Sequence, residues 1–102
     1  MRRLLSLTEQ GTQAINAFDA DRTWRVHPRV ALRTEPFGAL AYHYDTRRLL
    51  FLKSPTLAEL VSSLSRYASA TDAIEAIVPA PERAMYRRAL ARLAASEIID
   101  DP

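Results

Sequence analysis

The sequence predicts an α+β domain in which a three-stranded antiparallel sheet precedes three helices, the layout of a winged-helix-like module. Residues 24–53 contain extended stretches separated by short turn signals. Residues 54–99 instead show helical periodicity interrupted at prolines. With 102 residues, 48% of them hydrophobic, the chain can build one modest core. We expect an N-terminal arm over residues 1–22 and a single domain over residues 23–102.

Composition excludes several classes of site. The absence of cysteine removes disulfides and thiolate ligands, and two histidines, His27 and His43, are too few for the usual all-protein zinc site. Two glycines cannot form a glycine-rich phosphate loop. No apolar run approaches the ~20 residues of a membrane span, and the apolar start ends too soon for a secretion signal. We therefore expect a cytoplasmic protein without cofactor or metal, and no membrane partner.

Three strands are predicted in order. In the first, residues 24–35, Val30, Leu32 and Thr34 alternate with polar or small residues, as in a half-buried strand. Glu35-Pro36-Phe37-Gly38 has the proline and glycine positions of a type I turn. The second strand covers residues 38–44, and Asp45-Thr46 leads to a third over residues 48–53. Short connections imply an antiparallel meander.

The third strand is the candidate functional element. Leu49, Leu50, Phe51 and Leu52 make it apolar on both faces. A helix signal follows at once, so no fourth strand covers its outer edge. An open edge can pair with an extended peptide or with a second copy, which leaves a homodimer as an alternative. A proline at position 50 should then remove an amide donor needed for this pairing.

Helix signals fill the rest of the chain. Ser54-Pro55 and the Thr56-x-x-Glu59 capping box both mark a first helix, whose apolar stripe runs from Leu57 to Ala68. Ser69 begins a short second helix, which Pro79-Ala-Pro81 ends. Pro81 opens the third, with Tyr86, Ala89, Leu90, Leu93 and Ala94 on its inner face. Ile98 and Ile99 should fold back on the core.

Arginines mark the third helix and the third strand. Arg83, Arg87, Arg88 and Arg92 project from the helix, and Arg47, Arg48 and Lys53 flank the strand. A solvated helix face and a cationic wall that attracts peptide carboxylates explain the helix arginines about equally well. His43 near Asp45 could suggest a general base, but no nucleophile or oxyanion hole accompanies it, so a histidine beside a polar turn is the better interpretation.

A family resemblance rests on residues 25–60. The telling segments are Val26-His27-Pro28, Arg33 to Ala39 and Phe51 to Pro55. They resemble the mycofactocin peptide chaperones, which belong with the pyrroloquinoline quinone peptide chaperones among the RiPP recognition elements. The helices fit by pattern only. Members of this wider family often carry Asn before the first helix and Gly near the C-terminus, where this chain has Ser54-Pro55 and Ser96-Glu97.

The resemblance implies a non-catalytic adaptor. It implies that the leader of a ribosomally made precursor adds as a strand to the third strand, beside the third helix, and is presented to a radical S-adenosylmethionine maturase. Carried over to this sequence, the peptide-binding residues are expected to be Arg47, Arg48, Leu49, Leu50, Phe51, Leu52, Lys53, Arg83, Tyr86, Arg87 and Leu90.

Two alternatives come from other functional classes. A winged-helix DNA-binding domain shares the element order and could use the arginines, but a net charge of +2 gives no concentrated basic footprint, so no nucleic-acid partner is expected. An enzyme is the weakest alternative, because no acid, base, nucleophile or metal set converges in the sequence.

Overall fold

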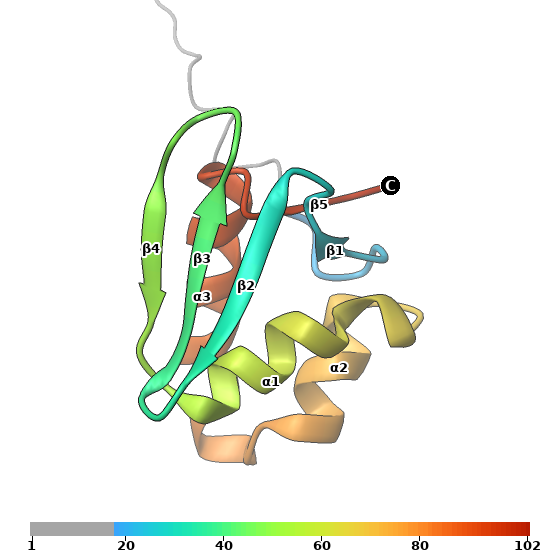
Figure 1. Ribbon diagram of the computed structural model, residues 1–102. Coiled ribbons are helices and arrows are strands. Elements are labelled where there is room, and N and C mark those ends of the chain that lie inside the picture. The colour runs from blue at the N-terminus through green and yellow to red at the C-terminus, as the bar shows by residue number, and fades with distance from the viewer. Residues whose placement is uncertain (1–17) are drawn as a thin grey trace, which may run out of the picture.

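The computed structural model describes residues 18–102 and confirms the α+β class. Part of the expected arm, residues 1–17, lies outside the described residues. Short 3-10 turns at Leu64–Arg66 and Ala80–Glu82 accompany the main elements. These elements, in chain order, are β1 (Arg25–Val26), β2 (Val30–Glu35), β3 (Gly38–His43), β4 (Leu49–Leu52), α1 (Pro55–Ser63), α2 (Ala70–Ile77), α3 (Arg83–Ala95) and β5 (Ile99–Asp100) (Figure 1).

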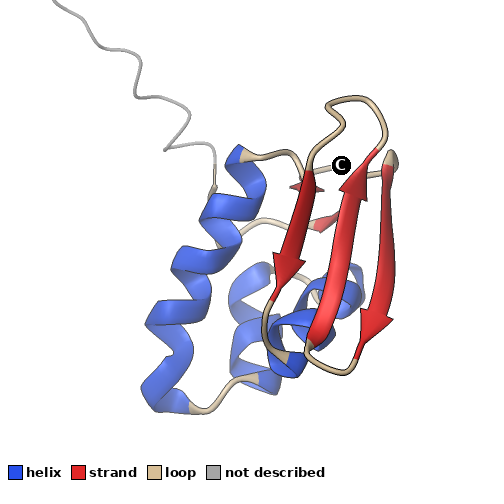
Figure 2. Ribbon diagram, turned by 60° about the vertical axis from the view of Figure 1, so that its left-hand side comes forward, coloured by secondary structure: helices blue, strands red, loops and turns tan. Residues whose placement is uncertain are grey.

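The main sheet is the predicted antiparallel meander, in the order β2-β3-β4. Its register pairs Val30 with His43 and Ala39 with Leu52. All helices lie on one side of this sheet (Figure 2). Because successive side chains of a strand point to opposite faces, every second residue of β3 faces the helices. These residues are Ala39, Ala41 and His43, and all three are buried. No element of residues 18–102 covers the opposite face of the sheet.

The core lies between the sheet and the helices. Leu52, Leu60, Leu64, Ile74 and Leu90 are fully buried there. Each such side chain contributes roughly 1.5–3 kcal/mol by leaving water. Trp24 is an anchor of this core: it is 4% exposed and its indole N–H donates to the Asp19 carbonyl at 2.8 Å.

A second, two-stranded sheet was not predicted. The sequence suggested one extended segment over residues 24–35, but a turn after His27 divides it, and β1 pairs with β5 instead of joining the main sheet. Arg25 and Asp100 face each other in this pair, 2.9 Å apart. The carboxylate raises the pKa of the Arg25 guanidinium by accepting its hydrogen bond. The predicted folding back of Ile98 and Ile99 is confirmed, since both are buried.

Two helix details differ from expectation. Ser54 is the N-cap of α1 and accepts the Leu57 amide at 3.1 Å, so Thr56 lies inside the helix and the expected capping box does not form. Helix α1 also ends at Ser63, before the Tyr67 and Ala68 of its predicted stripe. Serine is a weak helix former, and it recurs at 62, 63 and 65. Within residues 18–102, no helix has the length and apolar character that a bilayer crossing requires.

Candidate functional site

The outer edge of β4 is open in the part of the chain that the structure describes: no strand of residues 18–102 pairs with it. Backbone direction alternates along this edge. The His43 amide donates to the Arg48 carbonyl at 2.9 Å, in register with the β3–β4 pairs. Leu50 and Leu52, two and four residues on, therefore point their backbone groups at β3. The N–H and C=O groups of Leu49 and Phe51 point away from the sheet.

The expectation for a proline at Leu50 is corrected by this register. Leu50 faces Ala41 and uses its amide within the β3–β4 ladder. Proline there would damage the sheet itself. The amides available to a new strand belong to Leu49 and Phe51.

Side chains on β4 divide between two environments. Leu52 is 1% exposed and Leu50 is half-buried, so ordinary core packing is confirmed for this face. Leu49 and Phe51 are 52% and 55% exposed on the uncovered face of the sheet. Phe51 stacks on Phe37, with ring centroids 5.8 Å apart. Burial therefore explains the apolar side chains on the face of β4 that contacts the helices, but it does not explain the exposed Leu49 and Phe51 on the other face.

A groove of about 260 Å³ runs between β4 and α3. Its β4 wall includes the predicted Leu50, Phe51 and Leu52. Leu57 of α1, three residues of α3 and the residue that caps its C-terminus complete the lining, namely Ala89, Arg92, Leu93 and Ser96. The groove is therefore apolar with one cationic side chain, a surface that can receive alternate side chains of a strand lying along β4.

The junction between β4 and α1 fixes this groove. Ser54 Oγ accepts the Leu57 amide and also hydrogen-bonds the Tyr86 hydroxyl at 2.9 Å. Tyr86 comes from α3, so one serine ties the end of β4 to both helices. Gly38 lies against the same junction with φ +148°, where a Cβ would overlap the Leu52 carbonyl oxygen.

The expected site residues do not all meet in the groove. Leu90 is fully buried, and Tyr86 is 8% exposed with its hydroxyl bonded to Ser54. Arg83 turns to α2, where its guanidinium donates to the carbonyls of Val78 and Glu75 at 2.9 and 3.2 Å. Arg87 is exposed but is not part of the lining. At 100° per residue it lies about 140° around the helix from Arg92.

Positive charge does gather near β4. Arg47, Arg48 and Lys53 are all exposed at the two ends of the strand, and Arg92 lines the groove beside it. Arg47 has φ 64°, in the left-handed region, which reverses the chain just before β4. The sequence placed Leu57, Ala89 and Leu93 on apolar helix stripes and Arg92 among the helix arginines, but no signal in the sequence separates groove-lining residues from ordinary core or from a solvated face.

The structure also has a second, larger groove that the sequence analysis did not predict. It measures about 370 Å³ and lies along β2, the other edge strand, against α1. Glu35 and Glu59 contribute the charges of its lining. Glu35 is already paired with Arg33. The β2 edge therefore carries charges of both signs, whereas the charged side chains that flank β4 or line its groove are positive.

A general-base arrangement at His43 is not found. Its Nδ1 accepts the backbone amides of Asp45 and Thr46 at 3.2 and 3.3 Å. The Asp45 carboxylate pairs instead with Arg29 at 3.0 Å. His43 therefore orders the turn between β3 and β4, as the sequence interpretation favoured.

Comparison with known proteins decides the family. A model of the peptide chaperone MftB family matches residues 23–100. The chain belongs to the peptide chaperone MftB family. The peptide chaperone MftB of Mycobacterium ulcerans (strain Agy99) is 44% identical over 102 aligned residues, which cover 97% of this chain and 94% of that protein. This membership confirms the resemblance and agrees with a protein that is not an enzyme.

Two further MftB relatives align over a shorter range. The peptide chaperones MftB of Mycolicibacterium smegmatis (strain ATCC 700084 / mc(2)155) and Mycobacterium tuberculosis (strain ATCC 25618 / H37Rv) are each 46% identical over 83 residues. These residues cover 80% of this chain in both cases, and 81% and 76% of the respective relatives. No solved structure matches.

Proposed function

We propose that this chain is a peptide chaperone that binds the leader of a ribosomally synthesised precursor as an added strand along β4 and presents it to a radical S-adenosylmethionine maturase in mycofactocin biosynthesis. Membership in the MftB family supports the chaperone role. The observation that carries the binding mode is the open edge of β4, with the backbone groups of Leu49 and Phe51 directed away from the sheet.

Backbone pairing would supply affinity that depends little on sequence. Specificity would come from leader side chains that alternate between the groove beside α3 and the exposed face near Leu49 and Phe51. Because Arg47, Arg48, Lys53 and Arg92 surround this path, we expect acidic residues in the leader.

Two other properties follow from this proposal. A ribosomally made precursor is first available in the cytoplasm, which is therefore the expected location. A homodimer formed through β4 would occupy the same backbone groups as the leader. Self-association and leader binding should then compete, so added leader should shift a dimer to the monomer.

The decisive experiment compares prolines at neighbouring positions of β4. We expect Leu49→Pro to leave the fold intact and to weaken binding of a synthetic leader peptide at least tenfold, because its amide faces outward. Leu49→Ala, the matched control, removes the side chain but keeps that amide, so it should bind the leader clearly more tightly than Leu49→Pro. Fluorescence anisotropy measures the affinity and circular dichroism checks the fold.

Leu50→Pro completes the comparison. Its amide belongs to the β3–β4 ladder, so this variant should lose stability rather than binding alone. A folded Leu49→Pro variant with undiminished affinity would show that the leader does not pair with this edge. Retarded migration of nonspecific duplex DNA at low salt would instead support the alternative DNA-binding function.

A further inference from the structure

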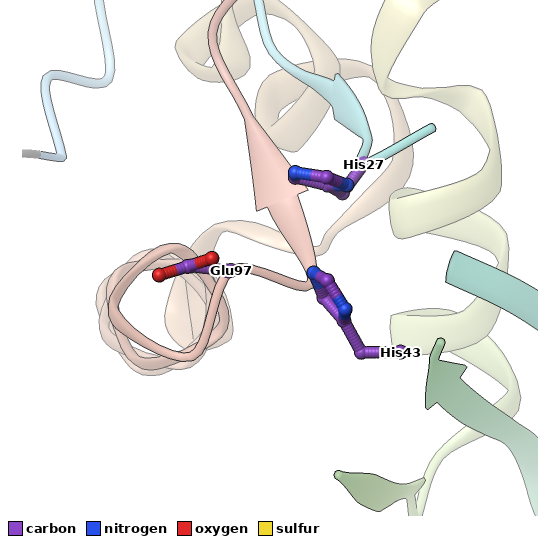
Figure 3. A group of neighbouring side chains, drawn as sticks. All are labelled: His27, His43 and Glu97. Atoms are coloured by element: carbon purple, nitrogen blue, oxygen red, sulfur yellow. The ribbon is translucent and has the colours of Figure 1, made fainter. Parts of the chain in front are cut away.

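Three side chains outside the groove converge on one small space. His27 follows β1, His43 ends β3, and Glu97 follows α3. One potential ligand atom from each lies within 4.8 Å of the other two. The two imidazole rings lie 4.6 Å apart between centroids, and Figure 3 shows Glu97 beside them with its carboxylate extending away from the rings.

His43 leaves one polar atom without a partner in this space. The residue is 1% exposed, and its Nε2 is buried with no hydrogen-bond partner among residues 18–102. Leaving a buried polar nitrogen unpaired is costly. His27 and Glu97 are less buried and can move towards it.

Glu97 occupies a backbone position that favours glycine. It has φ 64° immediately after α3. Its amide donates to the Ala94 carbonyl at 3.0 Å and the Ile98 amide donates to the Leu93 carbonyl at 2.9 Å, the two bonds of a Schellman motif. A glutamate here bears backbone strain that glycine would avoid, and it places a carboxylate oxygen within 4.8 Å of a ring nitrogen of each histidine.

We propose that His27, His43 and Glu97 bind a divalent first-row transition-metal ion, with Zn²⁺ as the ion to test. Two imidazoles and a carboxylate are ligands that Zn²⁺ accepts, and a water molecule could fill the fourth position. Tetrahedral zinc at ~2.1 Å from each ligand needs ligand atoms about 3.4 Å apart. The cluster must therefore contract by up to roughly 1.4 Å, through the more exposed Glu97 and His27.

The hydrogen bonds that the two imidazole rings already accept should limit the affinity for zinc. Nδ1 of His27 accepts the Arg29 amide at 3.0 Å, and Nδ1 of His43 accepts two longer amide bonds. Each neutral ring consequently carries its proton on Nε2 in the metal-free protein. Zn²⁺ would take the Nε2 lone pair, the proton would move to Nδ1, and these amides would lose their acceptor. We expect a Kd on the order of micromolar for this reason.

Metal binding would join three separate segments of the fold. His43 hydrogen-bonds Arg48 just before β4, and Ser96 in the groove lining precedes Glu97. The site therefore lies at one end of the groove between β4 and α3 and would restrain that end. Its existence does not depend on the proposed peptide function.

Zinc titration of the untagged, chelator-treated full chain tests the site. The chain has no cysteine and only these two histidines, so no other histidine or thiol can account for binding. We expect calorimetry to give one equivalent of Zn²⁺. The melting temperature should rise by roughly 10–20 °C at a hundredfold excess over Kd. Absence of both signals would overturn the proposal.

Variants of two of the three proposed ligands test whether this site causes the zinc-dependent rise in melting temperature, and both leave the buried His43 unchanged. Glu97→Gly should melt higher than the unchanged protein in the absence of metal, because glycine suits φ 64°, and should lose most of the zinc-dependent rise. His27→Gln should also lose that rise. Glu75→Gln, an exposed carboxylate on α2, is the matched control and should keep it. If both single variants kept the full zinc-dependent rise in melting temperature, the ion would be bound by other residues.

Discussion

Gly38 shows how one residue sets the position of the candidate edge. The hairpin between β2 and β3 has the two-residue loop Pro36-Phe37, and the register closes it at Glu35 and Gly38. Proline keeps φ negative, so the loop cannot be one of the primed turns that two-residue hairpins favour. Gly38 accommodates the mismatch with φ +148° and lets the hairpin lie against the Leu52–Ser54 backbone.

Replacing this glycine should therefore damage the fold near β4. A Cβ at Gly38 would overlap the Leu52 carbonyl oxygen and lie 2.8 Å from the Ser54 amide nitrogen. Since these are backbone atoms that cannot rotate away, we expect Gly38→Ala to lower the free energy of unfolding by roughly 2–4 kcal/mol. Urea denaturation measures this. Thr34→Ala, an exposed neighbour in β2, should change stability by less than about 0.5 kcal/mol.

The junction of β4, α1 and α3 is the decisive feature at the scale of elements. Ser54 is both the N-cap of α1 and the hydrogen-bond partner of Tyr86 in α3. The sequence proposed two overlapping helix starts, at Ser54-Pro55 and at Thr56, and only the first is used. Proline at N1 lacks an amide that would need a cap, which fits the observed start.

The hydrogen bond between Ser54 and Tyr86 should be measurable as a coupling free energy between the two residues. We expect Ser54→Ala to cost about 1–2 kcal/mol by loss of the cap, and Tyr86→Phe about 1 kcal/mol by loss of the hydroxyl contact. The double variant should cost less than the two together, because both remove the same hydrogen bond. Strict additivity in a urea-denaturation cycle would mean that Ser54 and Tyr86 stabilise the fold independently.

Sequence patterns could predict the elements that have periodicity and could not predict contacts between distant ones. The strands and their alternation, the Ser69 cap and the break at Pro79 are local signals, and the structure confirms them. Two-residue strands such as β1 and β5 carry no period. Likewise, the meeting of Glu97 with two histidines far along the chain depends on how α3 ends against the sheet, which no local pattern records.

At the scale of the whole molecule, the main sheet has two edges that no strand of the described chain pairs with, and their surroundings differ. The β4 edge borders α3 and carries Arg47, Arg48, Lys53 and Arg92. The β2 edge borders α1 and carries Glu35 and Glu59 together with Arg33, which pairs with Glu35. This asymmetry favours an acidic peptide at β4 over β2 through long-range attraction as well as direct pairing. Only arginines on the groove side of α3 should contribute to this attraction. The four helix arginines, which the sequence analysis grouped together, are therefore not equivalent.

Charge reversal on α3 distinguishes the two faces. Arg92 lines the groove, so Arg92→Glu should weaken leader binding about tenfold at 50 mM salt and clearly less at 500 mM, where screening shortens the reach of the charge. Arg87→Glu changes net charge equally but lies about 140° around the helix. It should therefore have a smaller effect at both salt concentrations. Equal losses in the two variants would mean that leader binding responds to net charge alone, and the groove beside β4 would then not be where the acidic residues lie.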